Sequence, residues 1–316
     1  MHILLKYMYI HMWQDYSDRL PVVGRQFLFI EMKESNVAII TISRGSYSRG
    51  KEVAESLAGR LGYECVSRDI LLEACEEFSI PEIKLVKALH DAPSVLERFK
   101  HGKIRYISYL RSAFFNHMVN DNIVYHGLAG HFFLQGISHV MKVRILANME
   151  DRVKEEMKRE NASEEEARYM LRKDDDERRR WGLALYGHDT WDCNLYDAVL
   201  RIDTLTVDDV VNTLHALVQT GRFDTSKESL NKLKNRALLA NIHAHIVNYA
   251  PHATIEYNDG IITLGNLEGL LKSDKEQRRK TTKMIVETYG VKDVVFAKPA
   301  VADKDHINPF YNIDFI

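Results

Sequence analysis

Two glycines and a lysine follow an apolar run near the start of the chain, in "AIITISRGSYSRGKEV" (residues 38–53). Gly45 and Gly50 are five positions apart, and Lys51 comes directly after the second glycine. This spacing is close to GxxxxGK[ST], in which backbone N–H groups and a helix N-terminus surround a phosphate. Glu52 stands where that motif has a hydroxyl residue that helps to hold Mg²⁺. The stretch therefore predicts a phosphate site, and an ordinary glycine-containing turn is the alternative.

The whole loop is predicted to hold the donor phosphates. Its residues are Gly45, Ser46, Tyr47, Ser48, Arg49, Gly50, Lys51 and Glu52. Lys51 would reach the outer phosphates as a point charge. Two roles are open for Glu52: it could hold a metal through water, or it could point to solvent in the first helical turn, where the helix dipole favours an acid.

A second chemistry-bearing feature is the charged run "RYMLRKDDDERRRW" (168–181). Its basic residues are Arg168, Arg172, Lys173, Arg178, Arg179 and Arg180. In a phosphoryl-transfer enzyme, arginines on a mobile segment close over the phosphates, neutralise the charge of the transferring group and exclude water. The alternative is a solvated helix whose charges form ion pairs between successive turns.

These features lie in a chain whose short apolar segments alternate with amphipathic helical ones. Strands are expected at 37–43, 63–67, 122–127, 140–147 and 197–203. Strands that alternate with helices favour an α/β fold with a parallel sheet. After a linker at 223–228, the pattern is helix, hairpin, helix and strand, with an Asp-Gly turn at 259–260. It predicts a second, small α+β domain of the αββαβ type.

Composition limits the classes of function. The 316 residues are 45% hydrophobic, and 43 basic against 45 acidic side chains give a formal net charge of −2. This balance gives little support to a role in coating nucleic acid. The three cysteines have no metal-ligand spacing, which suits a reducing cytoplasm and predicts no metal site made by the protein alone. No apolar run approaches a membrane span.

Residues 1–31 are expected to be an extension or the product of an upstream start, because Met32 opens a segment that reads like a natural beginning. We expect the main domain at 32–222, the second domain at 229–300 and a tail at 301–316.

The order of glycine loop, helices, charged run and closing strand resembles the nucleoside monophosphate kinases. More narrowly, it resembles the cytidylate kinase-like family, whose chains begin with an "ITISR…G" loop, over about residues 36–220. That family carries the pattern R-D-x-x-D-x-x-R, matched here by Lys173, Asp174, Glu177 and Arg180. The closing "LYDAVLRIDTLTVDDVV" (195–211) also fits. The resemblance implies a three-layer P-loop kinase fold, ATP with Mg²⁺, and catalytic roles for Lys51, Arg172, Lys173, Arg178 and Arg180.

The residues that would bind the phosphate acceptor depart from the family pattern. Ser67, with Asp69 two residues on, stands where the family has an aspartate after the second strand, and Leu128 replaces an arginine after Gly127. We take Ser67, Asp69 and Gly127 as the predicted acceptor-binding residues. Three interpretations stay open: an ATP-dependent nucleotide kinase, a kinase for a small non-nucleotide acceptor, and a catalytically inactive nucleotide sensor.

The C-terminal pattern resembles a BON domain. Asp259-Gly260 precedes the strand 261–265, and Gly290-Val291 lies three residues before Val294. The resemblance implies a module that binds a ligand or a surface, and self-association is the alternative. Among the histidines, His126 and His131 lie near the end of the third expected strand, where a structural role is favoured over a catalytic one.

Overall fold

The computed structural model describes residues 38–45, 48–67, 101–127, 130–267, 271 and 274–296. The chain divides after Asn36, and all the described residues belong to the unit Val37–Ile316. The predictions for residues 1–31, Ser46, Tyr47, Asp69, Leu128 and the tail 301–316 fall outside the described residues. Among the helices that are described, none combines the length and the apolar composition needed to cross a bilayer.

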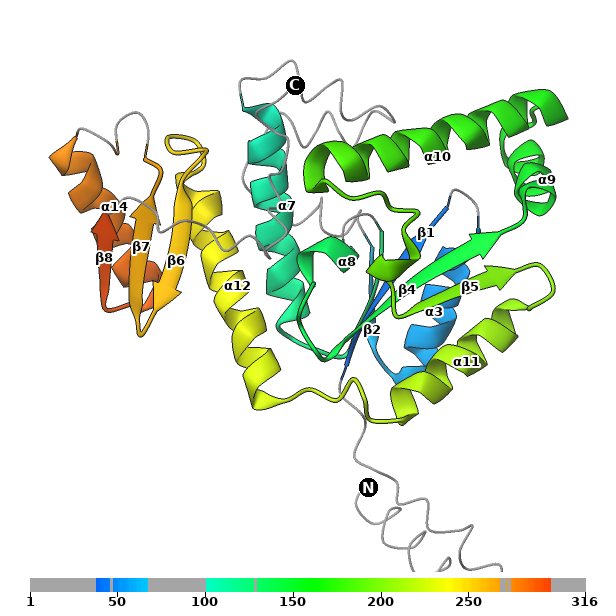
Figure 1. Cartoon of the computed structure of the whole chain (residues 1–316), viewed down its shortest axis with the longest axis horizontal. Coiled ribbons are helices and arrows are strands. Elements are labelled where there is room, and N and C mark those ends of the chain that lie inside the picture. The colour runs from blue at the N-terminus through cyan, green and yellow to red at the C-terminus, as the bar shows by residue number, and fades with distance from the viewer. Residues whose placement is uncertain are drawn as a thin grey trace, which may run out of the picture. The chain divides into compact units, whose positions relative to one another are not determined.

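Five strands form one parallel sheet in the order β2-β3-β1-β4-β5 (Figure 1). Their bounds are Ile39–Arg44 for β1, Glu64–Ser67 for β2, Ile123–His126 for β3, Val140–Ala147 for β4 and Ala198–Ile202 for β5. β1 is central and is hydrogen-bonded to β3 on one side and to β4 on the other. The α/β fold with a parallel sheet is therefore confirmed.

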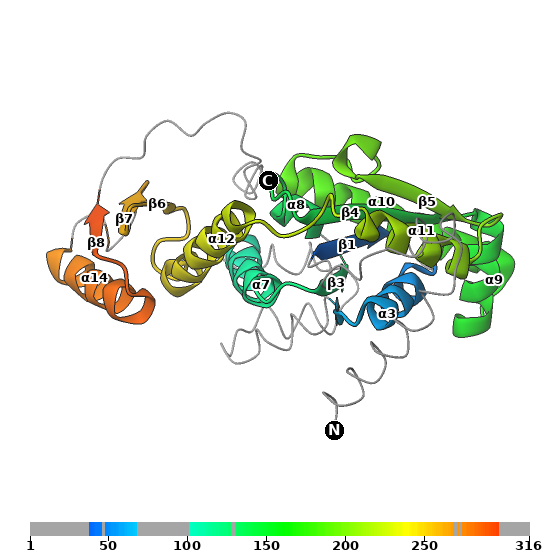
Figure 2. The same ribbon diagram turned by 90° about the horizontal axis from the view of Figure 1, so that it is seen from below.

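The two faces of this sheet are covered by different helices. Ile40 and Ile42 of β1 pack in one core with α3 (Gly50–Leu61) and α11 (Val207–Gln219), which lie side by side (Figure 2). Ile39 points the other way, into a core built with α7 (Gly102–Met118) and α8 (Gly130–Phe133). Because side chains alternate along a strand, β1 places Ile40 and Ile42 in one core and Ile39 in the other.

Two helices extend from the end of β4. α9 (Met149–Glu160) begins with Asn148 as its N-cap, whose side chain accepts a hydrogen bond from the backbone of Asp151. α10 (Glu164–Tyr186) begins with a capping box of Ser163 and Glu166. Figure 1 shows α10 running across the edge of the sheet at which β1 ends. A short 3₁₀ helix, Cys193–Leu195, then leads into β5.

The C-terminal elements follow the predicted αββαβ order, with α12 (Lys227–Ile246), β6 (Thr254–Asn258), β7 (Ile261–Gly265), α14 (Lys275–Tyr289) and β8 (Asp293–Phe296). The second sheet has the order β6-β7-β8, with β6 and β7 antiparallel and β7 and β8 parallel. The predicted small α+β unit is therefore present, while its likeness to a BON domain stays a prediction.

Polar contacts join α12 to α7. The Ser108 hydroxyl lies 2.7 Å from Nδ1 of His243, and the Ser112 hydroxyl donates to Asn241 at 2.6 Å. His243 Nε2 lies 3.1 Å from the carbonyl oxygen of Pro251. A carbonyl only accepts, so Nε2 carries the hydrogen and Nδ1 accepts from Ser108. Burial lowers the pKa of His243 to about 4, so this histidine is neutral at neutral pH.

This buried histidine makes stability depend on pH. Between pH 6.5, the ordinary histidine value, and about pH 4, the unfolded chain protonates His243 while the folded chain does not. The free energy of unfolding should then fall as pH falls through this window, by about 1.4 kcal/mol for each pH unit. Thermal unfolding of His243→Gln should show a shallower pH dependence than the wild type. His245→Gln, at an exposed position on the same helix, is the control, and equal slopes for wild type and His243→Gln would contradict this prediction.

Candidate phosphate and acceptor site

The glycine loop connects the carboxyl end of β1 to the start of α3. A Cβ atom on Gly50 would lie 2.8 Å from the Cβ of Arg44, so the loop accepts only glycine there without rearrangement. A Cβ on Gly45 would face Asp175 Oδ1 at 3.6 Å and Arg152 Cζ at 3.7 Å. The buried Ser48 closes the loop by donating its hydroxyl hydrogen to the carbonyl of Gly45 at 3.0 Å. The loop is therefore close to charged side chains of α9 and α10.

The residues that follow the loop are paired with one another. Arg49 has a φ of 57° and donates two hydrogen bonds, of 2.8 and 2.7 Å, to the carboxylate of Glu52. Glu52 is exposed in the first turn of α3. Glu52 therefore lies on the solvent side of α3 with its carboxylate bound by Arg49, and its role towards a metal stays a prediction. The Lys51 side chain is 62% exposed and lies 3.7 Å from Glu55.

A pocket lies beside this loop, at the carboxyl edge of the sheet. β1 and the loop contribute Ser43, Arg44 and Gly45, and β4 contributes Arg144. Helices α7 and α8 contribute Tyr106, Leu110, His131 and Phe132, and α10 with the segment after it contributes Asp175, Arg178, Trp181, Gly182, Tyr186, Thr190 and Trp191. The last two residues of β1 and the first residue of the glycine loop therefore also line the pocket.

Arg144 and His131 form the polar floor of the pocket, and Tyr196, which is outside the lining, holds Arg144 in place. Arg144 is 8% exposed and donates a hydrogen bond of 3.2 Å to the Tyr196 hydroxyl, with its guanidinium carbon 5.6 Å from the centre of the tyrosine ring. The same hydroxyl donates to the carbonyl of Thr190 at 3.0 Å and lies 3.3 Å from the Ser43 hydroxyl. Tyr196 therefore joins β4, the end of β1 and the segment after α10.

His131 is part of this floor and is uncharged. It is 2% exposed, and its Nε2 lies 3.4 Å from the Tyr196 hydroxyl. Burial lowers its pKa to about 3, and the positive charge of Arg144 acts in the same direction. The histidine contributes hydrogen-bonding capacity to the pocket without charge.

One face of α10 lines the pocket. Asp175, Arg178 and Gly182 follow one another at intervals of three and four residues, as expected for one side of a helix. Of the basic residues predicted to act in catalysis, Arg178 lines the pocket, whereas Arg172, Lys173 and Arg180 are exposed and lie outside its lining. Lys173 lies 3.8 Å from Glu177.

The family pattern is matched with Glu177 as the acidic residue and Arg180 as the basic one. The acidic and basic residues of α10 that line the pocket are instead Asp175 and Arg178, each two positions earlier in the helix. This displacement corresponds to a rotation of about 200° around a helix.

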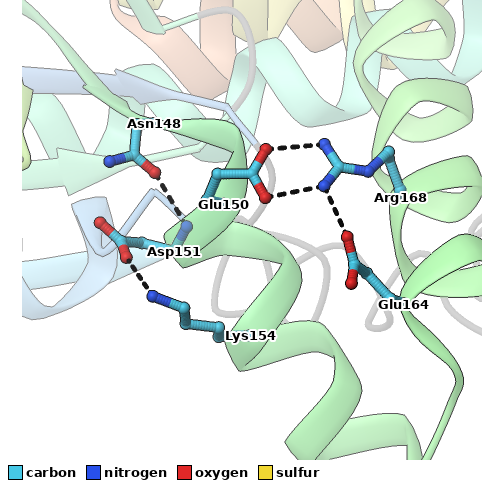
Figure 3. Close-up of polar contacts among 6 residues, drawn as sticks. All are labelled: Asn148, Glu150, Asp151, Lys154, Glu164 and Arg168. Carbon is cyan, nitrogen blue, oxygen red and sulfur yellow. Dashed lines mark hydrogen bonds and ion pairs between the residues drawn. The ribbon is translucent and has the colours of Figure 1, made fainter.

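Ion pairs hold α10 against α9. Arg152 of α9 binds Asp175 at 2.7 Å, with both side chains largely buried. Arg168 donates to both carboxylate oxygens of Glu150, at 2.9 and 2.7 Å, and to Glu164 at 2.9 Å (Figure 3). The first arginine of the charged run therefore stabilises the turn between two helices and lies outside the pocket lining.

The segment after α10 packs back onto that helix. A Cβ on Gly182 would lie 2.7 Å from Thr190 Cγ2 and 2.9 Å from the carbonyl oxygen of His188. Arg179 forms an ion pair of 2.6 Å with Asp189, and its guanidinium lies 5.0 Å from the centre of the Trp191 ring. These contacts hold Trp191, which is 54% exposed, at the edge of the pocket.

The predicted acceptor residues that can be placed lie at the ends of neighbouring strands. Ser67 ends β2 and is paired in register with His126 of β3. Gly127 follows β3, and its N–H donates to the carbonyl of Ile42 in β1 at 3.3 Å. Neither Ser67 nor Gly127 is among the residues that line the pocket.

Sequence reasoning missed Arg144, Arg152, Asp175, Trp181 and Tyr196. A signal existed for Arg144, because a strand covered on both faces should be apolar throughout and "VMKVRILA" has basic residues at alternate positions. For Asp175 there was none, since its neighbours on both sides are also aspartates.

Gly182 offers a test of how the pocket is built. Gly182→Ala should displace the segment 188–190, lower the melting temperature by several degrees and change the fluorescence of Trp191, because the added methyl meets backbone as well as side chain. Gly59→Ala is the matched control, since Gly59 lies in α3 with no atom within 4 Å of an added Cβ. It should be neutral or stabilising by about 0.5–1 kcal/mol. Equal melting temperatures for the two variants would contradict the packing described for Gly182.

A parallel sheet whose central strand leads through a glycine loop into a helix, with a charged helix across the same edge, defines an α/β protein of the P-loop kinase type. The sequence profile of the cytidylate kinase-like family matches residues 39–204, just over half of the chain. The chain belongs to the cytidylate kinase-like family. Comparison with the curated proteins finds no match.

Solved structures with a similar backbone fold include kinases. An uncharacterized protein from Eubacterium ventriosum is 20% identical, with a TM-score of 0.44, over 58% of this chain and 99% of that one. Shikimate kinase from Bacteroides thetaiotaomicron is 10% identical, with a TM-score of 0.38, over 58% and 99%. Dephospho-CoA kinase from Campylobacter jejuni is 16% identical, with a TM-score of 0.33, over 58% and 97%. Likenesses at this level do not extend to activity or substrate.

Proposed function

We propose that this protein is an ATP-dependent phosphotransferase that binds the donor phosphates on the loop between β1 and α3 and the acceptor in the adjoining pocket. The observation that carries the proposal is that Ser43, Arg44 and Gly45 both lead into the loop and line the pocket. Direct transfer requires donor and acceptor to be held in contact, because positioning supplies a large part of the rate enhancement. The family to which the chain belongs supports the same reaction class.

In the proposed reaction, an oxygen of the acceptor attacks the γ-phosphorus of ATP. The bond from that phosphorus to the bridging oxygen breaks, and ADP leaves with the electron pair of that bond. The protein contributes mainly position and charge. Arg178 lines the pocket and would act from its wall, whereas Arg172, Lys173 and Arg180 would act only after α10 turned or moved.

Lys51 is the proposed cation for the donor phosphates. Its present partner, Glu55, is a surface pair at 3.7 Å, and such pairs contribute only about 0.3–0.5 kcal/mol. The flexible lysine side chain can therefore leave Glu55 for a phosphate at little cost. The glycines at positions 45 and 50 keep the loop open to backbone N–H contacts with that phosphate.

Mg²⁺ would neutralise the charge of the donor phosphates when bound. Glu52 offers no hydroxyl ligand and its carboxylate is bonded to Arg49, while Asp175 is bonded to Arg152. Among the described residues there is no group of three side chains that could hold a metal ion. We therefore expect the ion to be held mostly by the nucleotide and by water, as is usual for Mg²⁺.

Lys51→Ala should weaken ATP binding by about tenfold or more, because a charged contact to phosphate is worth about 1.5–3 kcal/mol. The measurement is calorimetric titration with ATP and Mg²⁺, followed by a phosphate-acceptor screen. Lys280→Ala is a matched control, because Lys280 is also exposed and also pairs with a glutamate four residues away, at 2.8 Å from Glu276. Unchanged ATP binding and turnover in Lys51→Ala would rule out the assignment.

A nucleotide sensor without transfer is the second candidate. The observation that favours it is that Glu52, in the place of the metal-binding hydroxyl residue of the P-loop motif, has its carboxylate bound by Arg49. In that case the C-terminal unit, which contacts α7 through α12, would bind the ligand or partner that provides the output. Binding of ATP with transfer to no acceptor in the screen would favour the sensor.

A further inference from the structure

We propose that Arg144 is a binding residue for an oxyanion group of the acceptor, a carboxylate or a phosphoryl group, at the floor of the pocket. This inference rests on the proposed function, because it takes the pocket as the place of the acceptor. It assigns a chemical class to that acceptor and a residue that recognises it.

The position of Arg144 follows from the register of the sheet. Ser43 of β1 is paired with Arg144 of β4, and Ile39 is paired with Val140. Paired residues of neighbouring strands point to the same face, and residues at even intervals along a strand share a face. Ile39 and Val140 belong to the core beneath α7 and α8, so Arg144 emerges on that face beside the end of β1, where the apolar core gives way to the pocket.

The charge of Arg144 is buried without a carboxylate partner among the described residues. Its contacts are the hydrogen bond to the hydroxyl of Tyr196 and the approach to that tyrosine ring. Asp189 is near enough for Arg144 to contribute to lowering the pKa of its carboxyl group, but Arg179 binds Asp189 at 2.6 Å and lowers that pKa most. Arg144 is 8% exposed, and among the described residues no carboxylate pairs with its guanidinium.

Another basic residue of β4, in contrast to Arg144, has a carboxylate partner. Lys142, two residues before Arg144, is more exposed than Arg144 and has a carboxylate partner, Asp197, at 2.9 Å. Burying an unpaired charge costs several kcal/mol unless another group compensates it. A ligand that brings an anion into the pocket would supply this compensation, and the planar fork of an arginine binds two oxygens of one carboxylate or phosphoryl group.

The surroundings of Arg144 support binding of an anion. Tyr196 fixes the guanidinium from one side and is itself held by the carbonyl of Thr190 at 3.0 Å. His131, the other titratable group of the floor, stays neutral and brings no competing charge. Arg178 stands on the α10 wall of the same pocket. An anion entering here meets the Arg144 guanidinium, because the carboxylate that lines the pocket, Asp175, is already bound by Arg152.

The test is a fluorescence titration without nucleotide, because Trp181 and Trp191 both line the pocket. The wild type is titrated separately with inorganic phosphate and with malonate at constant ionic strength. We expect a saturable change with at least one of them, and the anion that produces it distinguishes a phosphoryl group from a carboxylate. Arg144→Met should weaken that binding by about tenfold or more. Arg201→Met, which removes an exposed arginine of β5 outside the pocket lining, should bind as the wild type does.

Thermal unfolding without added anion gives a second readout. Arg144→Met should melt at the same temperature as the wild type or higher, because it removes an uncompensated buried charge. A lower melting temperature together with an unchanged anion response would identify a structural arginine and overturn the proposal. If Arg144→Met does not fold, Arg144→Lys serves instead, and it should bind the anion more weakly than the wild type because lysine lacks the planar fork.

The two proposals fail separately. Arg144→Met should keep the ATP binding of the wild type, and Lys51→Ala should keep the response to the anion. The absence of a saturable change in the wild type with both anions, or its persistence in Arg144→Met, would overturn the role of Arg144 and leave the donor site untouched. Loss of the anion response in Lys51→Ala alone would place the anion on the glycine loop and would also overturn it.

Discussion

The position of β1 between two parallel neighbours is the constraint on which the rest of the site depends. All the strands of a parallel sheet end at the same edge, so the loop after β1, the last residues of β4 and the turn after β3 must meet there. Apolar side chains on both faces of β1 fix the strand between two cores. Where those cores end, at Ser43 and Arg144, polar groups can face a ligand while the backbone remains rigidly held.

Packing also decides which charged residues of helix α10 face the pocket. Leu171 and Ala167 pack with Val153 of α9 in a small core, and the buried pair of Arg152 and Asp175 continues that contact towards the loop. These contacts set which side of α10 faces the sheet. The arginines of the charged run therefore lie in three different surroundings. Arg168 joins two helices, Arg178 lines the pocket and Arg180 is exposed to solvent.

Helix α7 connects the pocket to the C-terminal unit. Tyr106 and Leu110 line the pocket, while Ser108 and Ser112 bind α12. Positions that alternate along the helix thus contact two different parts of the protein. In the sensor hypothesis, α7 would connect ligand binding to the C-terminal unit, because a ligand that moves α7 would change the contacts between α7 and α12.

The sequence by itself determined the elements and their order. Apolar runs covered on both faces predicted a parallel sheet, Gly45 and Gly50 marked the loop, and the Asp-Gly turn predicted the hairpin of the second sheet. These features depend on neighbours along the chain, so local pattern is enough to find them. The tertiary structure decided which charges face the pocket. A run with a charged residue at nearly every position has no preferred face, and only packing against α9 set the rotation of α10. The role proposed for Arg144 likewise depends on the register that places it beside Ser43, because burial without a partner is a property of three-dimensional surroundings.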